Sequence, residues 1–296
     1  MRSFADLIMR NRLVAILVVA FATVLPLLSW VGGAAFALVT LRKGALEGLL
    51  VALGATALLG VQFAFSIGDP RAALMVAVQL WLPLFLVSLW LRATISLASA
   101  IQVAALLGVA VVVGVHLLLP NPAAYWKEVL EPARQLAAQS GPDAAGAWKN
   151  FEATLLPVMT GLWVLNMLSL VLSSLLVGRW WQAMLYNPGG FKEEFHALRF
   201  DYRFALLAAV LLIASVVRGP GLIYDAALVM GSIFVLETLA VAHRLVATGF
   251  WNRAWLVAVY VLCLLLFRIM MAVGIIDAFV DIRRRLAQRS GPSGPG

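Results

Sequence analysis

Charged and polar side chains inside long apolar runs are the residues of this chain best suited to bind a ligand. An ionisable group at bilayer depth costs a few kcal/mol unless it has a partner, an aqueous cavity or a short path to the headgroups. A polar amide in the same setting also needs a hydrogen-bond partner. Four of the residues in such runs are the predicted ligand-binding residues: Glu237, Asp225, Arg268 and Asn166.

Asp225 and Arg268 are predicted to form an ion pair. If the last two apolar segments run antiparallel about a turn near residue 248, Arg268 faces the level of residue 228. Asp225 lies three residues from that level, about 4.5 Å along a helix, whereas Glu237 lies nine residues away, about 14 Å. Such a pair either fixes helix packing or contacts a substrate.

Glu237 has no basic residue at its own level on the neighbouring segment. In one interpretation its carboxyl group is protonated, or faces a polar cavity together with Asn166 or Gln79. In the other, it reaches the membrane interface beside His243 and Arg244. Only the first interpretation makes Glu237 a ligand-binding residue.

Signatures of catalytic and metal centres are absent from the sequence. There is no HExxH, Walker or GxSxG motif, and the three histidines are not clustered. The single cysteine, Cys263, lies in an apolar run, which excludes an internal disulfide and a multi-cysteine metal cluster. Asp225 and Asp277 faintly resemble the paired aspartates of intramembrane aspartyl proteases, but the second lacks the GxGD spacing. We expect no catalytic residues, no metal and no cofactor; a membrane-embedded enzyme is the third hypothesis.

The composition is that of an integral membrane protein. The 296 residues are 63% apolar and 12% charged, and the mean hydropathy is +0.98. Apolar runs near the length of a membrane-crossing helix, about 20 residues, recur along the chain, and strand alternation is absent. We predict an all-α polytopic transmembrane helical bundle of about seven to nine membrane segments, one or two of them broken or re-entrant. The segments fall at residues 13–41, 45–67, 72–91, 93–119, 154–177, 204–217, 221–242 and 254–276.

One of these segments contains a break signal, and a second break signal lies between two later segments. Residues 13–41 are too long for one upright helix or a signal-peptide core, and they include Pro26 and Gly32-Gly33. We expect either one kinked, tilted span or two short helices that meet near the glycines. The Arg218-Gly219-Pro220-Gly221 sequence separates two later segments and could form a re-entrant element.

The charge distribution favours lipid over nucleic acid as a partner. The formal net charge is +8, and the arginines stand singly or in pairs at segment ends. That pattern suits anionic headgroups and the positive-inside rule. We expect a multi-pass protein of the bacterial cytoplasmic (inner) membrane that does not bind nucleic acid.

Residues 1–289 are predicted to form a single membrane domain, followed by a flexible tail at 290–296. The domain carries an extramembrane insert at residues 120–152, in which apolar positions between Tyr125 and Ala137 recur at helical spacing. We expect one amphipathic helix that lies on the outer face of the membrane the chain spans and is ended by Gly141-Pro142.

Residues 178–203, GRWWQAMLYNPGGFKEEFHALRFDYR, are predicted to form a cytoplasmic interfacial loop. Tryptophans that follow a span favour the headgroup level, and the Asn-Pro-Gly-Gly sequence predicts a turn. Helical spacing of the aromatic residues after the turn predicts a short amphipathic helix. The residues that define the loop are Trp180, Trp181, Asn187, Pro188, Gly189, Gly190, Phe191, Glu194 and Phe195.

Small residues recur at every fourth position in one segment, which allows close helix packing. This stripe either packs within the bundle or docks a second membrane protein. It consists of Ser96, Ala100, Ala104 and Gly108. The 178–203 loop is the other predicted contact for a membrane protein partner.

The 178–203 run resembles the YybS-like family of uncharacterised bacterial inner-membrane proteins, together with LPLLSWVGGAAFALVTLRKGALEGLLVAL at 25–53 and GIIDAFVDIRRRL at 274–286. That family is distantly similar to the S-components of energy-coupling-factor vitamin importers and to the rod-shape protein MreD. The resemblance implies a helical bundle with a small-molecule pocket on the outer side. The chain has more apolar segments than the six helices of S-components, and its first helix has no clear Ala-x-x-x-Ala docking motif.

Two functional hypotheses follow. In the first, the chain binds a small or lipid-like ligand as an S-component-like transporter subunit, because ionisable residues and broken spans are features of transporter sites. In the alternative, it is an MreD-like scaffold or assembly factor of the cell envelope that acts through its small-residue stripe and interfacial loop.

Overall fold

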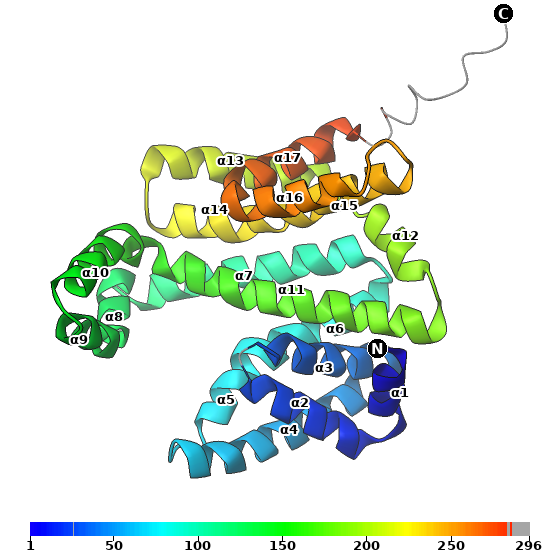
Figure 1. The fold of residues 1–296 in the computed structure, drawn as a ribbon, viewed down its shortest axis with the longest axis horizontal. Coiled ribbons are helices and arrows are strands. Elements are labelled where there is room, and N and C mark those ends of the chain that lie inside the picture. The colour runs from blue at the N-terminus through cyan, green and yellow to red at the C-terminus, as the bar shows by residue number, and fades with distance from the viewer. Residues whose placement is uncertain (26, 283–284, 286–296) are drawn as a thin grey trace, which may run out of the picture. The chain divides into compact units, whose positions relative to one another are not determined.

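The computed structural model describes residues 1–25, 27–282 and 285, and within them it is all-α, without strands (Figure 1). This confirms the predicted helical membrane bundle. Five helices in the described part of the chain are long and apolar enough to cross a membrane, and counting two bent helix pairs as spans raises the number to seven. The predicted tail at 290–296 lies outside the described residues.

The chain forms two compact units, a division that the sequence did not suggest. Unit 1 comprises residues 1–104 and 167–198, and unit 2 comprises residues 105–166 and 199–296. Two long helices, α7 (Leu97–Leu118) and α11 (Met159–Tyr186), each begin in one unit and end in the other. Each unit is described separately below.

Unit 1 contains residues 1–104, the second part of α11 and the helix that follows it. Its remaining elements are α1 (Arg2–Arg10), α2 (Arg12–Val24), α3 (Ser29–Lys43), α4 (Ala45–Ser66), α5 (Ala72–Val76), η1 (Ala77–Trp81), α6 (Leu82–Thr94) and α12 (Gly190–His196). The π-helical turn η1 ends two residues before Pro83, which lacks the backbone N–H that a regular α-helical hydrogen-bond ladder would need.

The first apolar run forms two helices, as one of the two predicted alternatives stated, but they do not meet near the glycines. Helix α2 ends at Val24, where Leu25 is extended as expected for a residue before proline. Pro26 itself lies outside the described residues. Gly32 lies inside α3, where a Cβ would come within 2.8 Å of Thr23 Oγ1. The glycine pair therefore brings helices close together and does not end one.

Helix α3 is the centre of unit 1, since every residue from Gly32 to Leu41 is buried. A Cβ on Gly33 would collide with Ser174 of α11, and a Cβ on Gly178 would lie 2.8 Å from Ala37 Cβ. The last carbonyl groups of α3 accept hydrogen bonds from Arg92, at 2.7 Å for Leu41 O and 2.9 Å for Arg42 O. Small residues and one arginine thus hold α3 among its neighbours.

Unit 2 contains the insert and the C-terminal helices. Its elements besides α7 and α11 are α8 (Pro122–Val129), α9 (Glu131–Gln139), α10 (Pro142–Thr154), η2 (Leu156–Val158), α13 (Tyr202–Arg218), α14 (Leu222–Ser232), α15 (Phe234–Ala247), α16 (Ala254–Leu265) and α17 (Phe267–Val280). Helices α14 and α15 form one candidate span, and 83% of its most apolar window is buried.

The insert is three short helices, so the prediction of one amphipathic helix is wrong. The helix α8 ends before Leu130, and Pro132 is the second residue of α9. Gly141, with φ of 113°, precedes Pro142 at the start of α10. Proline fits the first turn of a helix but not its interior, and the spacing of apolar residues did not take Pro132 into account.

Helices α13 and α14 pack side by side as a hairpin, joined by Gly219 and Gly221, both with positive φ. Helix α17 packs along α15, where Thr238 Oγ1 donates to Met270 O at 2.7 Å. Gly274 makes this packing possible, because a Cβ there would collide with Phe234 O. Helices α16 and α17 are bent by 116° at Leu266, which makes this pair the broken element near the C-terminus.

Candidate functional site

The best-defined polar group inside the membrane segments of unit 2 is a histidine–aspartate pair. His116 lies in the last turn of α7, and Asp225 lies in the first turn of α14. His116 Nε2 is 2.9 Å from Asp225 Oδ2. The Asp225 side chain is 1% exposed and the His116 side chain 16% exposed. The imidazole is therefore the hydrogen-bonding partner of the buried carboxylate, and it is the member of the pair that reaches the protein surface.

Gly161 closes the other side of the carboxylate. It lies in the first turn of α11, and a Cβ there would come within 2.5 Å of Asp225 Oδ1 and 2.9 Å of Asp225 Cα. Asp225 Oδ1 has no regular hydrogen-bond partner among the described residues. The absent side chain at position 161 thus lets α11 and α14 approach, and it brings the Gly161 backbone N–H to the Asp225 carboxylate.

The insert contacts the first turn of α11 next to this pair. Trp126 of α8 donates from Nε1 to Thr160 Oγ1 at 2.8 Å, and its ring lies 5.8 Å from that of Trp163. Thr160 directly precedes Gly161. Helix α8 is therefore fixed to the turn that packs on Asp225, which gives the insert a structural link to the pair.

The prediction that Arg268 pairs with Asp225 is wrong. Arg268 lies over the ring of Tyr224, with 4.8 Å between the guanidinium carbon and the ring centroid. The argument from depth assumed that the last apolar segment is one straight helix. Because α16 and α17 are bent by 116°, the number of residues from the turn near 248 does not measure depth.

Glu237 contacts the backbone of its own unit. It is fully buried in α15, and its Oε2 accepts a hydrogen bond from Phe200 N at 3.1 Å. Residues 197–201 are not helical, so Phe200 N is a buried donor that needs an acceptor outside a helix. Asn166 is exposed on α11. The four predicted ligand residues thus have different surroundings, and only Asp225 belongs to the pair.

His116 is the functional candidate that the sequence did not single out. The sequence does contain a feature that could have identified it, since His116 is the one titratable residue in the apolar run 93–119. No spacing rule links it to Asp225, because the two positions are 109 residues apart.

The predicted interfacial loop is more helical than expected. Helix α11 continues to Tyr186, and the turn at 187–189 precedes α12, where Gly189 has φ of 93°. Trp181 is 1% exposed and packs edge-to-face on Phe4 at 5.6 Å, whereas Trp180 is 39% exposed. The two tryptophans therefore differ: one is core and the other lies at the surface.

The charged residues that follow are also partly built into unit 1. Glu194 of α12 forms an ion pair with Arg179 of α11 at 2.9 Å. Burial raises the pKa of the Glu194 carboxyl, opposed by Arg179 and by the backbone N–H of Leu97. Phe191 and Phe195 stack at 6.0 Å between centroids. Among the other loop residues, Asn187, Pro188 and Gly189 are exposed, and Gly190 lies against the Asn187 side chain.

The small-residue stripe is largely covered by the chain itself. Ala100 and Ala104 are 0% and 4% exposed. A Cβ on Gly108 would lie 2.8 Å from Val229 Cγ1. Ser96 precedes α7, where its Oγ accepts from Ser99 N at 3.2 Å.

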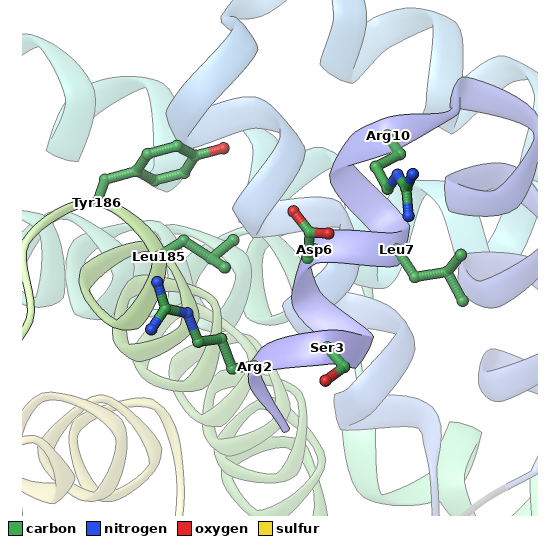
Figure 2. Close-up of a pocket in the computed structure, with 7 residues that line it drawn as sticks. All are labelled: Arg2, Ser3, Asp6, Leu7, Arg10, Leu185 and Tyr186. Carbon is green, nitrogen blue, oxygen red and sulfur yellow. The ribbon is translucent and has the colours of Figure 1, made fainter.

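Unit 1 carries a pocket of about 600 Å³ between α1 and the end of α11 (Figure 2). Helix α1 contributes Arg2, Ser3, Asp6, Leu7 and Arg10, and α11 contributes Leu185 and Tyr186. The lining thus combines two cations, a carboxylate, two hydroxyl groups and two leucines.

Comparison with known proteins gives no relative for this chain: no family model matches it, and neither a curated protein nor a solved structure matches it.

Proposed function

We propose that this multi-pass membrane protein is a transporter component that binds a small or lipid-like ligand, and that the His116–Asp225 pair exchanges a proton as part of that cycle. The observation that carries the proposal is the 2.9 Å contact between these side chains inside apolar helices. A buried carboxylate in an apolar segment is costly, and titratable groups within membrane segments mark ion and proton pathways in transporters.

The chemistry of the pair suits proton exchange. Histidine is the side chain whose ordinary titration falls near neutral pH, and a carboxylate beside it stabilises the protonated imidazole. The Gly161 backbone approaches Asp225 Oδ1, so protein encloses the carboxylate on the side opposite His116.

The setting of the pair supports a transport role over a purely structural one. Asp225 lies in the first turn of α14, just after the hairpin turn at Gly219 and Gly221. Arg268, near the start of α17, lies over the ring of the neighbouring Tyr224. Helix ends and broken helices inside membranes are where transporters form their sites. The resemblance to the YybS-like family and S-components points the same way, and with it we propose the bacterial inner membrane as the location.

The proposal is tested by native mass spectrometry of the full chain, extracted into nanodiscs from its own membrane. We expect one defined small molecule or lipid to be retained by the wild type and lost in Asp225→Asn, which keeps the shape of the side chain. Glu237→Gln is the matched control, since it neutralises another buried carboxyl group of unit 2 but keeps an acceptor for Phe200 N.

Two results would contradict the proposal. One is a bare wild-type chain, or one that retains a stable protein partner and no small molecule, as the scaffold hypothesis predicts. The other is equal loss of the ligand in Asp225→Asn and Glu237→Gln, which would show that any buried change disturbs the bundle.

A further inference from the structure

We infer that the pocket between α1 and the end of α11 binds a lipid headgroup in which two phosphodiesters flank a glycerol hydroxyl. This inference concerns a second site and is independent of the proposed function, because the pocket belongs to unit 1 and the His116–Asp225 pair to unit 2.

Helix α1 is held in place by its apolar side. Ala5 and Ile8 are fully buried, and Phe4 packs on Trp181 of α11. The opposite side presents Arg2, Asp6 and Arg10, all exposed. A bend of 120° separates α1 from α2, so α1 does not continue the direction of the helix that follows it. An anchored amphipathic helix with this orientation suits the membrane interface.

The charges on this side of α1 have a specific order. Arg2 and Arg10 are eight residues apart, about 12 Å along the helix, and Asp6 lies halfway between them. None of the three forms an ion pair among the described residues. Figure 2 shows Asp6 between the two arginines, with Leu185 and Tyr186 facing them from α11. Two separate cations thus flank one hydrogen-bond acceptor.

Each part of this order matches a part of the headgroup. Guanidinium groups bind phosphate oxygens with paired hydrogen bonds, and two positions call for two phosphates. A carboxylate between them would repel a single phosphate placed at the centre but accepts a hydrogen bond from a hydroxyl group. Leu7 and Leu185 offer apolar surface for the start of the acyl chains.

The net charge of the side chains around the pocket also fits two phosphates. Arg42, at the end of α3, lies over the Tyr186 ring with 4.0 Å to its centroid, so a third guanidinium borders the pocket. Three arginines and one carboxylate give a net charge of about +2, which the two phosphodiesters neutralise. Basic clusters next to membrane spans attract anionic headgroups, and here Tyr186 ends the span that begins at Leu156.

The experiment compares two lipids at equal charge. The full chain is placed in nanodiscs of phosphatidylcholine that contain either diphosphatidylglycerol or twice as much phosphatidylglycerol, and retained lipid is counted by native mass spectrometry. We expect preferential retention of diphosphatidylglycerol. Arg2→Gln and Arg10→Gln should each lower its retention about fivefold, the effect of one basic residue near a charged surface.

Two further variants separate headgroup recognition from simple attraction. Arg71→Gln removes an exposed arginine of unit 1 that lies outside the pocket, and it should leave retention unchanged. Asp6→Ala makes the pocket more positive but removes the acceptor for the glycerol hydroxyl. We expect it to lower the preference for diphosphatidylglycerol, although simple attraction would predict stronger binding.

Three outcomes would overturn the inference. The first is equal retention of the two anionic lipids by the wild type. The second is a loss in Arg71→Gln as large as in the pocket variants. The third is displacement of bound lipid by inorganic phosphate at matched phosphate concentration, which would assign the pocket to a soluble phosphate and not to a lipid.

Discussion

His116 Nε2 lies 2.9 Å from Asp225 Oδ2, and the two residues are 109 positions apart in the chain. This contact joins the last turn of α7 to the first turn of α14 inside unit 2. Because the carboxylate is buried and the imidazole is partly exposed, the pair connects an interior acceptor to the surface through one titratable ring. The proposed function rests on this connection.

Gly161→Ala should destabilise unit 2, because its Cβ would come within 2.5 Å of Asp225 Oδ1 and 2.9 Å of the Asp225 backbone. Overpacking of this kind costs about 1–3 kcal/mol. Gly114→Ala is the matched control: it also lies in a helix of unit 2, but a Cβ there meets nothing within 4 Å. Thermal unfolding in nanodiscs compares the two, and equal melting temperatures would mean that α11 does not approach Asp225 this closely.

His116→Leu should destabilise the protein more than Arg268→Met. Removal of His116 leaves a buried carboxylate without its partner, which costs about 3 kcal/mol or more. Arg268 is exposed and contacts the Tyr224 ring, an interaction worth about 1 kcal/mol or less. If Arg268→Met lowered the melting temperature more than His116→Leu, the sequence-based pairing of Asp225 with Arg268 would have been the better one.

Trp181→Ala and Trp180→Ala should have very different effects. Trp181 is buried against Phe4, and truncation of a buried tryptophan costs about 3–5 kcal/mol. Trp180 is 39% exposed, so its replacement should matter much less in a lipid environment. Chemical denaturation of the two variants measures the difference directly. Similar losses would support the original view that both rings lie at the interface.

Glu194 should give unit 1 a pH-dependent stability. Burial raises the pKa of its carboxyl above the ordinary value of 4.5, so the folded state holds this proton more tightly than the unfolded state. The associated stability is present at low pH and is lost as the pH rises from about 4.5 through the raised pKa. Melting temperatures of the wild type and Glu194→Gln, measured over that range, should therefore diverge in favour of the variant as the pH increases. Parallel curves would contradict the assigned burial.

The helical type of the elements and the positions of several spans could be predicted, because long apolar runs without strand alternation indicate membrane helices. The number of segments could not, since the described residues contain five candidate spans, or seven with the bent pairs, against the seven to nine expected. The run 45–67 became α4 at Ala45–Ser66, and the run 93–119 became α7 at Leu97–Leu118. Local breaks were harder. The insert is interrupted at Leu130 because Pro132 fits the first turn of a new helix and not a helix interior. A rule based on apolar spacing alone does not detect this.

Partners inside the bundle could not be predicted, since they depend on how helices pack. The depth estimated for Arg268 was wrong because α16 and α17 are bent at Leu266. The backbone N–H that Glu237 accepts from lies in the non-helical stretch before α13, and no side-chain pattern reveals it. To predict His116 as the partner of Asp225, one must know that the end of α7 contacts the start of α14, and a single sequence does not contain that information. Asp225 was therefore recognised from its residue type but given the wrong partner, and His116 was missed.

The most direct test of the central proposal follows the proton on His116. The protein is labelled with ¹⁵N-histidine, and the resonance of His116 is assigned with His116→Gln and followed by NMR in nanodiscs as the pH is varied. We predict that this resonance changes from the protonated to the neutral form while the protein stays folded, and that Asp225→Asn alters the change. A His116 resonance that stays in one form over the whole folded range would contradict proton exchange at the pair.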